Sequence, residues 1–202
     1  MVSCPGQAQN AFIEAARANA SAASPGPALA ATTIVRVFIE GCVAHEGDSM
    51  RTVDWAINQG FEPVYAQGGA AETLLSGRPG TVLALPGSTS PLLLAVDVER
   101  RCTVWAERGD GLAVRAEFAK AISVLASKGA HVQPALERTV ERGGAWRLQL
   151  QMRYRRVGGS QDFGVGSVTT LTAQPAAQAL NLAPLPVRPE TSSADPQGLP
   201  VR

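Results

Sequence analysis

The chain carries three cysteines, and two of them lie inside apolar segments where they can pair with each other. Cys42 lies in the segment 37–43 and Cys102 lies in the segment 101–106. One interpretation is a disulfide that joins a helix to a strand, which indicates an oxidising compartment because disulfides persist there. The other is a pair of buried free thiols, since cysteine also packs as a small apolar residue. No CxxC or HxxxH spacing supplies further ligands, so we expect no metal site.

The third cysteine, Cys4, ends a segment that resembles the end of a lipoprotein cleavage box. The apolar part of such a box is not visible upstream, and the segment lacks the basic and apolar stretches of a signal peptide. If translation starts further upstream, we expect Cys4 to be the lipidated first residue of the mature chain. The alternative is a chance cysteine near the terminus. No apolar run reaches the about 18 residues of a transmembrane helix, so no transmembrane segment is expected.

The sequence contains few side chains whose type and spacing are typical of a catalytic site. His45 lies beside Glu46 and Asp48, a set that can hold a cation or act as a base. Its place after a helix end makes an exposed or dipole-stabilised imidazole the simpler interpretation. His131 opens a strand and is interpreted as a surface residue, and Ser88 lies in a turn without the G-x-S-x-G pattern of a nucleophile. Phosphate-binding glycine motifs are absent. We therefore expect no catalytic residue and no cofactor.

The most plausible binding surface is a row of arginines. It consists of one strand face and the residue that follows the strand: Arg147, Arg153, Arg155 and Arg156. Guanidinium groups on one face can bind an acidic protein partner, a lipid headgroup or nucleic acid. The alternative is that Glu137 and Glu141 on the preceding strand neutralise them across the sheet. No aromatic residue interleaves with the arginines and the net charge is only +1, so nucleic acid is not expected.

Residues 146–155 give the clearest pattern of secondary structure, because apolar and polar side chains alternate strictly. This alternation predicts a half-solvated antiparallel strand. Further strands are predicted at 81–85, 92–98, 102–107, 131–140 and 163–172, with a bulge or close backbone approach at Gly164 and Gly166. Helices are predicted from Thr33 as N-cap, from Asp48 as N-cap, at about 70–76, and from Asp110 over about 111–127.

These elements predict an α+β fold. We expect an antiparallel sheet of about five to six strands with helices packed on one face and an N-terminal helical layer. On the helix after Asp48, the buried face is predicted to hold Met50, Val53 and Ile57. The 202 residues suit one domain with additional segments at both ends.

Composition divides the chain into three parts. Residues 1–30 are predicted to form a flexible N-terminal arm and residues 31–173 the globular domain. Residues 174–202 are rich in proline and poor in large apolar groups. Such a segment cannot offset its ordering entropy, so we expect a disordered or extended tail.

Several segments resemble a family of small exported bacterial proteins or lipoproteins of uncharacterised function. The resemblance is carried by residues 38–45, 53–56, 83–87, 92–96 and 102–106, with the F-x-x-x-C helix and the C-x-V strand as its most specific parts. It covers about 31–173 and implies a location in the cell envelope. It assigns no catalytic or ligand-binding residue.

The expected function is therefore that of a non-enzymatic protein of the cell envelope, periplasmic or lipid-anchored. It would act as an interaction or accessory subunit with a protein partner. The second expectation is a small-molecule binding module with a pocket between the helices and the sheet. A hydrolytic enzyme ranks third.

Overall fold

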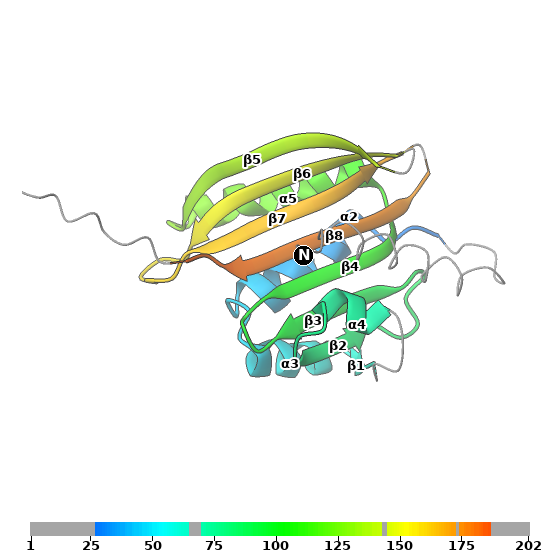
Figure 1. Cartoon of the computed structure of the whole chain (residues 1–202), viewed down its shortest axis with the longest axis horizontal. Coiled ribbons are helices and arrows are strands. Elements are labelled where there is room, and N and C mark those ends of the chain that lie inside the picture. The colour runs from blue at the N-terminus through cyan, green and yellow to red at the C-terminus, as the bar shows by residue number, and fades with distance from the viewer. Residues whose placement is uncertain (1–26, 65–69, 143–144, 173, 187–202) are drawn as a thin grey trace, which may run out of the picture.

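The computed structural model describes residues 27–64, 70–142, 145–172 and 174–186, which build an α+β fold around one antiparallel sheet (Figure 1). The sheet order is β1-β2-β3-β4-β8-β7-β6-β5. The strands of the described chain are β1 (Glu62–Pro63), β2 (Gly80–Ala84), β3 (Leu92–Asp97), β4 (Cys102–Gly109), β5 (His131–Arg142), β6 (Ala145–Arg155), β7 (Phe163–Leu171) and β8 (Ala176–Pro184). The prediction of an α+β fold with an antiparallel sheet is confirmed, whereas the predicted number of strands is wrong because the sheet has eight.

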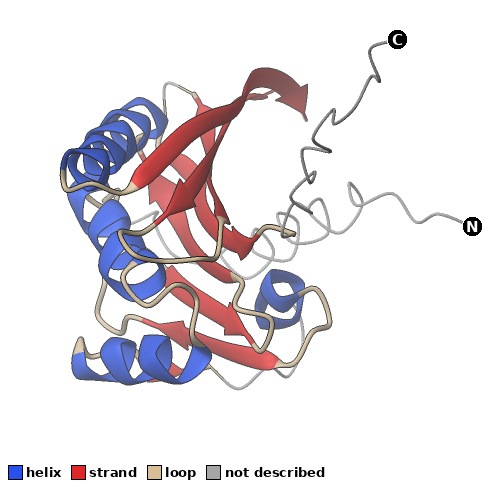
Figure 2. Ribbon diagram, turned by 90° about the vertical axis from the view of Figure 1, so that its left-hand side faces the viewer, coloured by secondary structure: helices blue, strands red, loops and turns tan. Residues whose placement is uncertain are grey.

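Helices cover the two faces of the sheet unequally. The helical segments are α2 (Ala31–Val37), the π-helix η1 (Phe38–Val43), α3 (Ser49–Asn58), α4 (Ala70–Leu75) and α5 (Gly111–Ser127). Figure 2 shows α2, α3 and α5 on one face, and the short α4 on the other. We call the face that carries α4 the concave face, because the sheet curves around it (Figure 2).

Two of the three predicted helix caps are correct. Asp48 and Asp110 each accept a hydrogen bond of 3.0 Å from a backbone N–H of the helix that follows. Such a side-chain oxygen satisfies one of the backbone donors left unpaired at a helix start. The predicted cap at Thr33 is wrong, because α2 begins at Ala31 without a side-chain cap.

The buried face of α3 differs from the prediction. Met50 and Ile57 are 76% and 51% exposed, and only Val53 of the predicted trio packs partly against the core. The helix instead turns the fully buried Thr52 inward, where its hydroxyl donates a 3.0 Å hydrogen bond to the carbonyl of Gly41. A polar residue, Thr52, therefore lies at the contact between α3 and η1. The apolar pattern of α3 does not predict this burial, because Thr52 is not part of that pattern.

Strand β8 corrects the predicted domain boundary. It pairs antiparallel with β4 on one side and with β7 on the other, in the middle of the sheet. Leu180 is completely buried and Leu182 is 1% exposed. The prediction of a tail from residue 174 is therefore wrong, and residues 187–202 lie outside the described part of the chain.

The N-terminal boundary is also shifted. Leu29, which falls inside the predicted arm, is 8% exposed and forms an isolated parallel bridge with Gly109. Its backbone N–H donates a 2.9 Å hydrogen bond to the carbonyl of Arg108. The ordered fold thus begins before residue 31, while residues 1–26, including Cys4, lie outside the described residues.

Alternation along the strands gives the sheet two different faces. On β4, Cys102, Val104 and Ala106 are buried in the core under the helices. The intervening Thr103 and Trp105 belong to the concave face, where they line a groove (see below). Of the two predicted roles of Gly164 and Gly166, the bulge is wrong, because β7 pairs with β6 in unbroken register from Phe163 to Leu171. The close backbone approach is confirmed at Gly166, where an added Cβ would lie 3.1 Å from the carbonyl oxygen of Leu150.

The disulfide between Cys42 and Cys102 is confirmed. It joins η1 to the first residue of β4, with the two Cα atoms 5.5 Å apart. Both cysteines are fully buried, and they lie 60 positions apart in the sequence. The bridge therefore fixes the helical layer to the middle of the sheet.

Truncating a β8 side chain tests whether this strand belongs to the core. We expect Leu180→Ala to lower the free energy of unfolding by about 2–5 kcal/mol, because it leaves a cavity in a closely packed region. The matched control is Leu112→Ala on α5, where the side chain is 65% exposed and the expected loss is below about 0.5 kcal/mol. Urea unfolding measures both. Equal losses in the two variants would show that β8 contributes no core.

Reducing the disulfide should destabilise the fold strongly. Chain entropy predicts a loss of about 4 kcal/mol for a closed loop of 60 residues. Urea unfolding with and without reductant measures the loss, and intact mass under non-reducing conditions should be two hydrogens below the reduced mass. A Cys4→Ser variant serves as the control and should retain the bridge. An unchanged mass on reduction would exclude the bridge.

Candidate functional site

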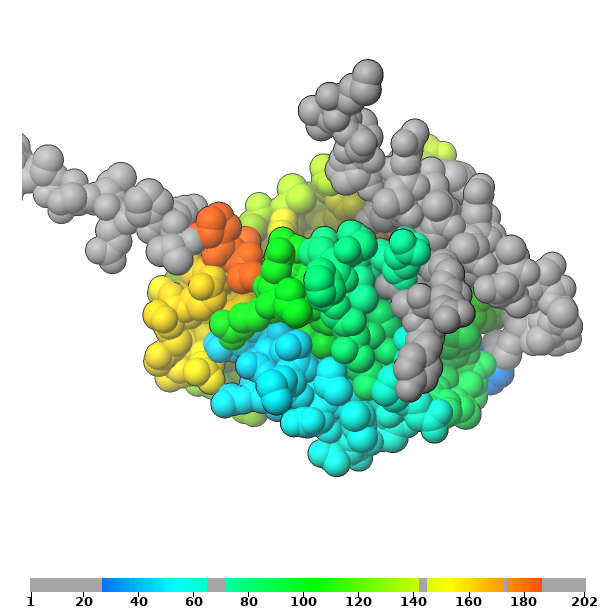
Figure 3. Space-filling view, turned by 60° about the horizontal axis from the view of Figure 1, so that its bottom comes forward, coloured from blue at the N-terminus to red at the C-terminus, as the bar shows by residue number. Residues whose placement is uncertain are grey.

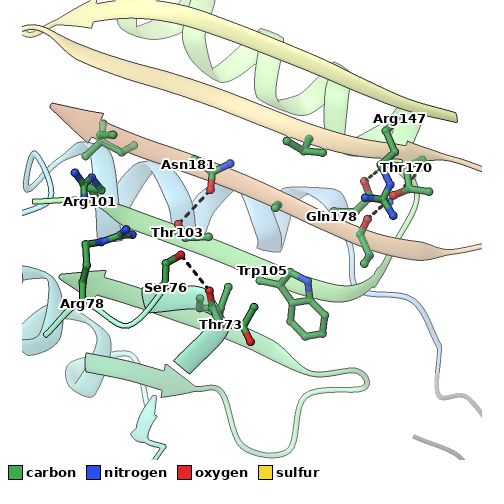
Figure 4. Close-up of a pocket in the computed structure, with 16 residues that line it drawn as sticks. Thr73, Ser76, Arg78, Arg101, Thr103, Trp105, Arg147, Thr170, Gln178 and Asn181 are labelled. Atoms are coloured by element: carbon green, nitrogen blue, oxygen red, sulfur yellow. Dashed lines mark hydrogen bonds between the residues drawn. The ribbon is translucent and has the colours of Figure 1, made fainter. Parts of the chain in front are cut away.

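A groove of about 410 Å³ lies on the concave face of the sheet (Figure 4). One wall comes from α4 and the residues that follow it, the floor from β4 and β8, and the other wall from β6 and β7. Leu75 of helix α4 packs there against Val82 and Ala95 of the sheet in a small apolar cluster. This second, minor cluster explains why a short helix lies on the face opposite the main helical layer.

The floor of the groove exists because β8 alternates small and large side chains. Ala177, Ala179 and Ala183 line the groove, whereas the intervening Leu180 is completely buried in the core. Successive side chains of a strand point to opposite faces. The methyl groups on the groove side leave space that larger side chains would fill.

A polar pair crosses the floor between its two ends. The hydroxyl of Thr103 on β4 donates a 3.1 Å hydrogen bond to the amide oxygen of Asn181 on β8 (Figure 4). These residues lie directly opposite each other in the register of the two strands. The hydrogen bond orients the Asn181 side chain, so that its amide nitrogen remains as a donor at the groove.

One end of the groove carries two arginines that share a buried carboxylate. The Nε atom of Arg78 lies 2.6 Å from Oδ2 of Asp97, and Nη1 of Arg101 lies 3.6 Å from the same oxygen. The other oxygen of Asp97 accepts 2.9 Å hydrogen bonds from the backbone of Glu99 and Arg101. Arg101 also pairs with the carboxylate of Glu99 at 2.5 Å. Asp97 therefore fixes the β3–β4 turn and orients both guanidinium groups.

Arg147 and Gln178 lie at the opposite end (Figure 4). The amide nitrogen of Gln178 donates 3.0 Å hydrogen bonds to the carbonyls of Gly109 and Ala176, and its amide oxygen accepts one of 3.0 Å from the backbone of Thr170. Gln178 thus closes this end as a structural residue. Among the described residues that line the groove, three are arginines and none carries a carboxylate.

Three of the four predicted surface arginines share the polar face of β6, but only Arg147 reaches the groove. Arg153 and Arg155 instead converge on one carboxylate of the β6–β7 turn. The distances to Asp162 are 2.8 Å from Nη1 of Arg153 and 3.7 Å from Nε of Arg155. The strand face is therefore basic, and two of its guanidinium groups share one carboxylate.

The predicted pairing of these arginines with Glu137 and Glu141 is wrong. The β5–β6 register places Glu137 opposite Leu150 and Glu141 opposite Trp146, and directly opposed side chains share a face. Both glutamates therefore project to the side of the helices. Glu137 accordingly pairs with Arg115 of α5 at 2.7 Å.

Arg156 belongs to a different cluster at one end of the sheet. Its Nε lies 3.0 Å from the carboxylate of Glu46, which also pairs with Arg100 at 3.3 Å. The cluster joins the loop after η1, the β3–β4 turn and the end of β6, and Figure 3 shows these segments side by side at the surface. Burial, and then the charge of Glu46, raise the pKa of the neighbouring Tyr154 phenol above 10.0.

The histidines do not belong to the groove. His45 is half-buried in the loop before α3, and His131 is exposed at the start of edge strand β5. Across the ranges that the structure describes, no group of three His, Cys, Asp or Glu side chains lies close enough to hold a metal ion.

Most residues of the groove had no predicted role. Trp105, Thr103 and Asn181 come from strands that the sequence presents as core elements or as a tail, and Arg101 comes from the turn before β4. The alternating alanines of β8 are the signal that could have identified them, because such alternation marks a strand with one open face.

No protein-family model matches the chain, and no curated protein is significantly similar to it. Among the helices in the described part of the chain, none is both long and apolar enough to cross a membrane.

The Tyr154 phenol predicts a loss of stability at high pH. Because its folded pKa is raised above 10.0, the unfolded chain releases this proton at a lower pH than the folded chain does. The stabilising contribution is complete below pH 10.0 and falls as the pH rises through the folded pKa. Urea unfolding measures the free energy of unfolding as the pH rises above 10.0. Tyr154→Phe should lose less of this free energy than Tyr65→Phe, which replaces the chain's other tyrosine. Identical pH profiles would contradict the assignment.

Proposed function

We propose that this protein is a non-enzymatic accessory subunit of the bacterial cell envelope that binds a partner in the groove on its concave face. The observation that carries the proposal is the lining of the groove. It combines a floor where the alanines of β8 lie beside Trp105 of β4, a fixed polar pair, and arginines at both ends. Apolar surface with a few convergent polar groups is the usual composition of a binding site.

The proposed location is the periplasmic side of the envelope. It is supported by the Cys42–Cys102 disulfide, since such bonds are maintained in oxidising compartments. Lipidation at Cys4 and membership of a family of small exported proteins or lipoproteins are parts of the same proposal. An anchored domain with a groove on one open face would be held near the membrane while presenting that face to a partner.

The groove is well suited to selective binding because its polar groups are already oriented. Asp97 orients the two arginines at one end, and the Thr103 hydroxyl orients the Asn181 amide. Side chains fixed in this way lose little conformational entropy when a partner binds.

A small-molecule binding module is the second candidate. The volume of about 410 Å³ lies within the range of about 300–1,000 Å³ that is usual for ligand sites. Such a ligand would lie between α4 and the concave face. The space between the main helical layer and the sheet is instead filled by the core.

Charge reversal in the groove separates the two candidates. We expect tagged full-length protein, purified from cross-linked and detergent-solubilised envelopes, to carry a stoichiometric protein partner. Arg147→Glu should remove that partner because it places a negative charge in a site that we propose to be complementary to the partner. Arg51→Glu, an equal change of charge on the exposed surface of α3, should leave recovery unchanged.

Unfolding midpoints of both variants must match that of the unmodified protein for the comparison to be valid. A small molecule seen by native mass spectrometry, without a protein partner, would support the second candidate. Equal recovery of the partner by both variants would show that the groove is not the partner surface.

A further inference from the structure

We infer that the groove accepts an extended segment of an acidic polypeptide, with two carboxylates about six residues apart, a spacing set by the strand rise. The inference rests on the proposed function and specifies the chemistry of the partner. It follows from the length of the groove, the distribution of its polar groups and its charge.

The length follows from the strand register. Cys102 pairs with Leu182, so Arg101 lies beside Ala183 at one end of β8. At the other end, Arg147 of β6 pairs with Thr170 of β7, which lies next to the Thr169–Gln178 pair and therefore beside Ala177. Strand β7 lies between Arg147 and β8, so a ligand along β8 meets Arg147 from the side, and the rise of β8 gives the spacing of the two ends along the strand only. The stretch of β8 from Ala177 to Ala183 spans ~20 Å at the usual rise of a strand. An extended peptide of about six residues has the same length.

The side-chain alternation of an extended peptide fits this spacing. Residues an even number of positions apart in a strand project from the same side. Two carboxylates separated by about six positions therefore face the groove together, one towards Arg101 and one towards Arg147. The intervening side chains on that side meet the alanines of β8, so small residues are expected there.

The polar groups lie along the groove and not at one end only. Thr103 and Asn181 form the central pair, while Ser76 and Thr170 lie among the other lining residues. A peptide backbone offers a carbonyl acceptor at every residue, which the amide nitrogen of Asn181 can use. An acyl chain would cover this donor without replacing its hydrogen bond to water, which is costly. The distribution therefore favours a peptide over a lipid.

The charge of the groove favours an acidic ligand. Three arginines line it, and the side chains of Arg78 and Arg101 keep 33% and 40% of their surface exposed. Their carboxylate partners are the buried Asp97 and the exposed Glu99, both on the β3–β4 turn and neither in the lining. A bound carboxylate would thus approach donors that the turn already holds in place.

The test uses the purified full chain and a synthetic array of labelled heptapeptides. Each peptide carries aspartate or asparagine at its first, fourth and seventh positions, with mixtures of small residues between them. Fluorescence anisotropy at low ionic strength should show that peptides with aspartate at the first and seventh positions bind at least about tenfold more tightly than their asparagine counterparts. Aspartate at the first and fourth positions should not reproduce this gain.

Two variants place the peptide in the groove. Arg101→Glu, which reverses one of the two positive charges at that end, should abolish the preference for aspartate. Ala179→Leu, which fills the floor, should weaken all peptides by at least about tenfold. The matched controls are Arg51→Glu and Ala126→Leu, whose side chains lie exposed on α3 and α5. Each control should bind as the unmodified protein does.

Several outcomes would overturn the inference. These are binding without dependence on charge, an equal gain from the shorter spacing, and a groove-dependent preference for phosphatidylglycerol vesicles over the peptides. If any of these occurs while Arg147→Glu still loses its envelope partner, the proposed function stands and only the peptide chemistry is wrong. If recovery of the envelope partner is also unaffected by Arg147→Glu, both proposals fail.

Discussion

The pairing of β8 with both β4 and β7 is the interaction on which the rest of the fold depends. Strands β1 to β4 form one antiparallel run and β5 to β7 form another, and β8 is the strand that joins them into a continuous sheet. Its inner side chains, Leu180 and Leu182, complete the core, and its outer alanines form the floor of the groove. Because β8 is the last strand of the described residues, both the core and the groove depend on contacts between residues far apart in sequence. Such contacts carry a large loop-closure cost, which the burial of apolar surface must offset.

A disulfide, several ion pairs and side-chain hydrogen bonds lie close together where η1 meets the β3–β4 hairpin. The Cys42–Cys102 bridge fixes the helix to the strand, and Glu46 joins the loop after η1 to Arg100 and Arg156. Asp97 secures the turn from the concave side. The same turn therefore receives covalent, ionic and hydrogen-bonded support from both faces of the sheet. An end of the groove built on such a turn can hold charged side chains in fixed positions without help from a ligand.

Local signals in the sequence predict most of the local structure, with the cap at Thr33 as an exception, and the other main failures concern contacts at long range. Asp48 and Asp110 were identified as caps because a cap depends only on the next few residues. The sequence predicts a tail because prolines dominate the composition after residue 173, whereas the alternation on β8 extends only from Ala177 to Ala183. Of the four arginines in the predicted surface, only Arg147 lines the groove, because neither the register of β6 nor the position of α4 is encoded within that strand. The groove itself needs α4 on the concave face, and this is decided by a small apolar cluster that no periodic pattern reveals.

The net charge of +1 hides a separation of charge between the two faces of the sheet. On β5 and β6, Glu137 and Glu141 project to the side of the helices while Arg147 and Arg153 project to the concave side. A chain that is nearly neutral as a whole can therefore present a basic surface locally, and overall charge is a poor guide to its partners. Successive side chains of β8 also point to opposite faces of the sheet, so Leu180 packs in the core while Ala179 lines the groove. Substitutions on the outer side of this strand can thus alter binding with little effect on stability. Under the proposed function, a fold of this kind could change its partner without rebuilding its core.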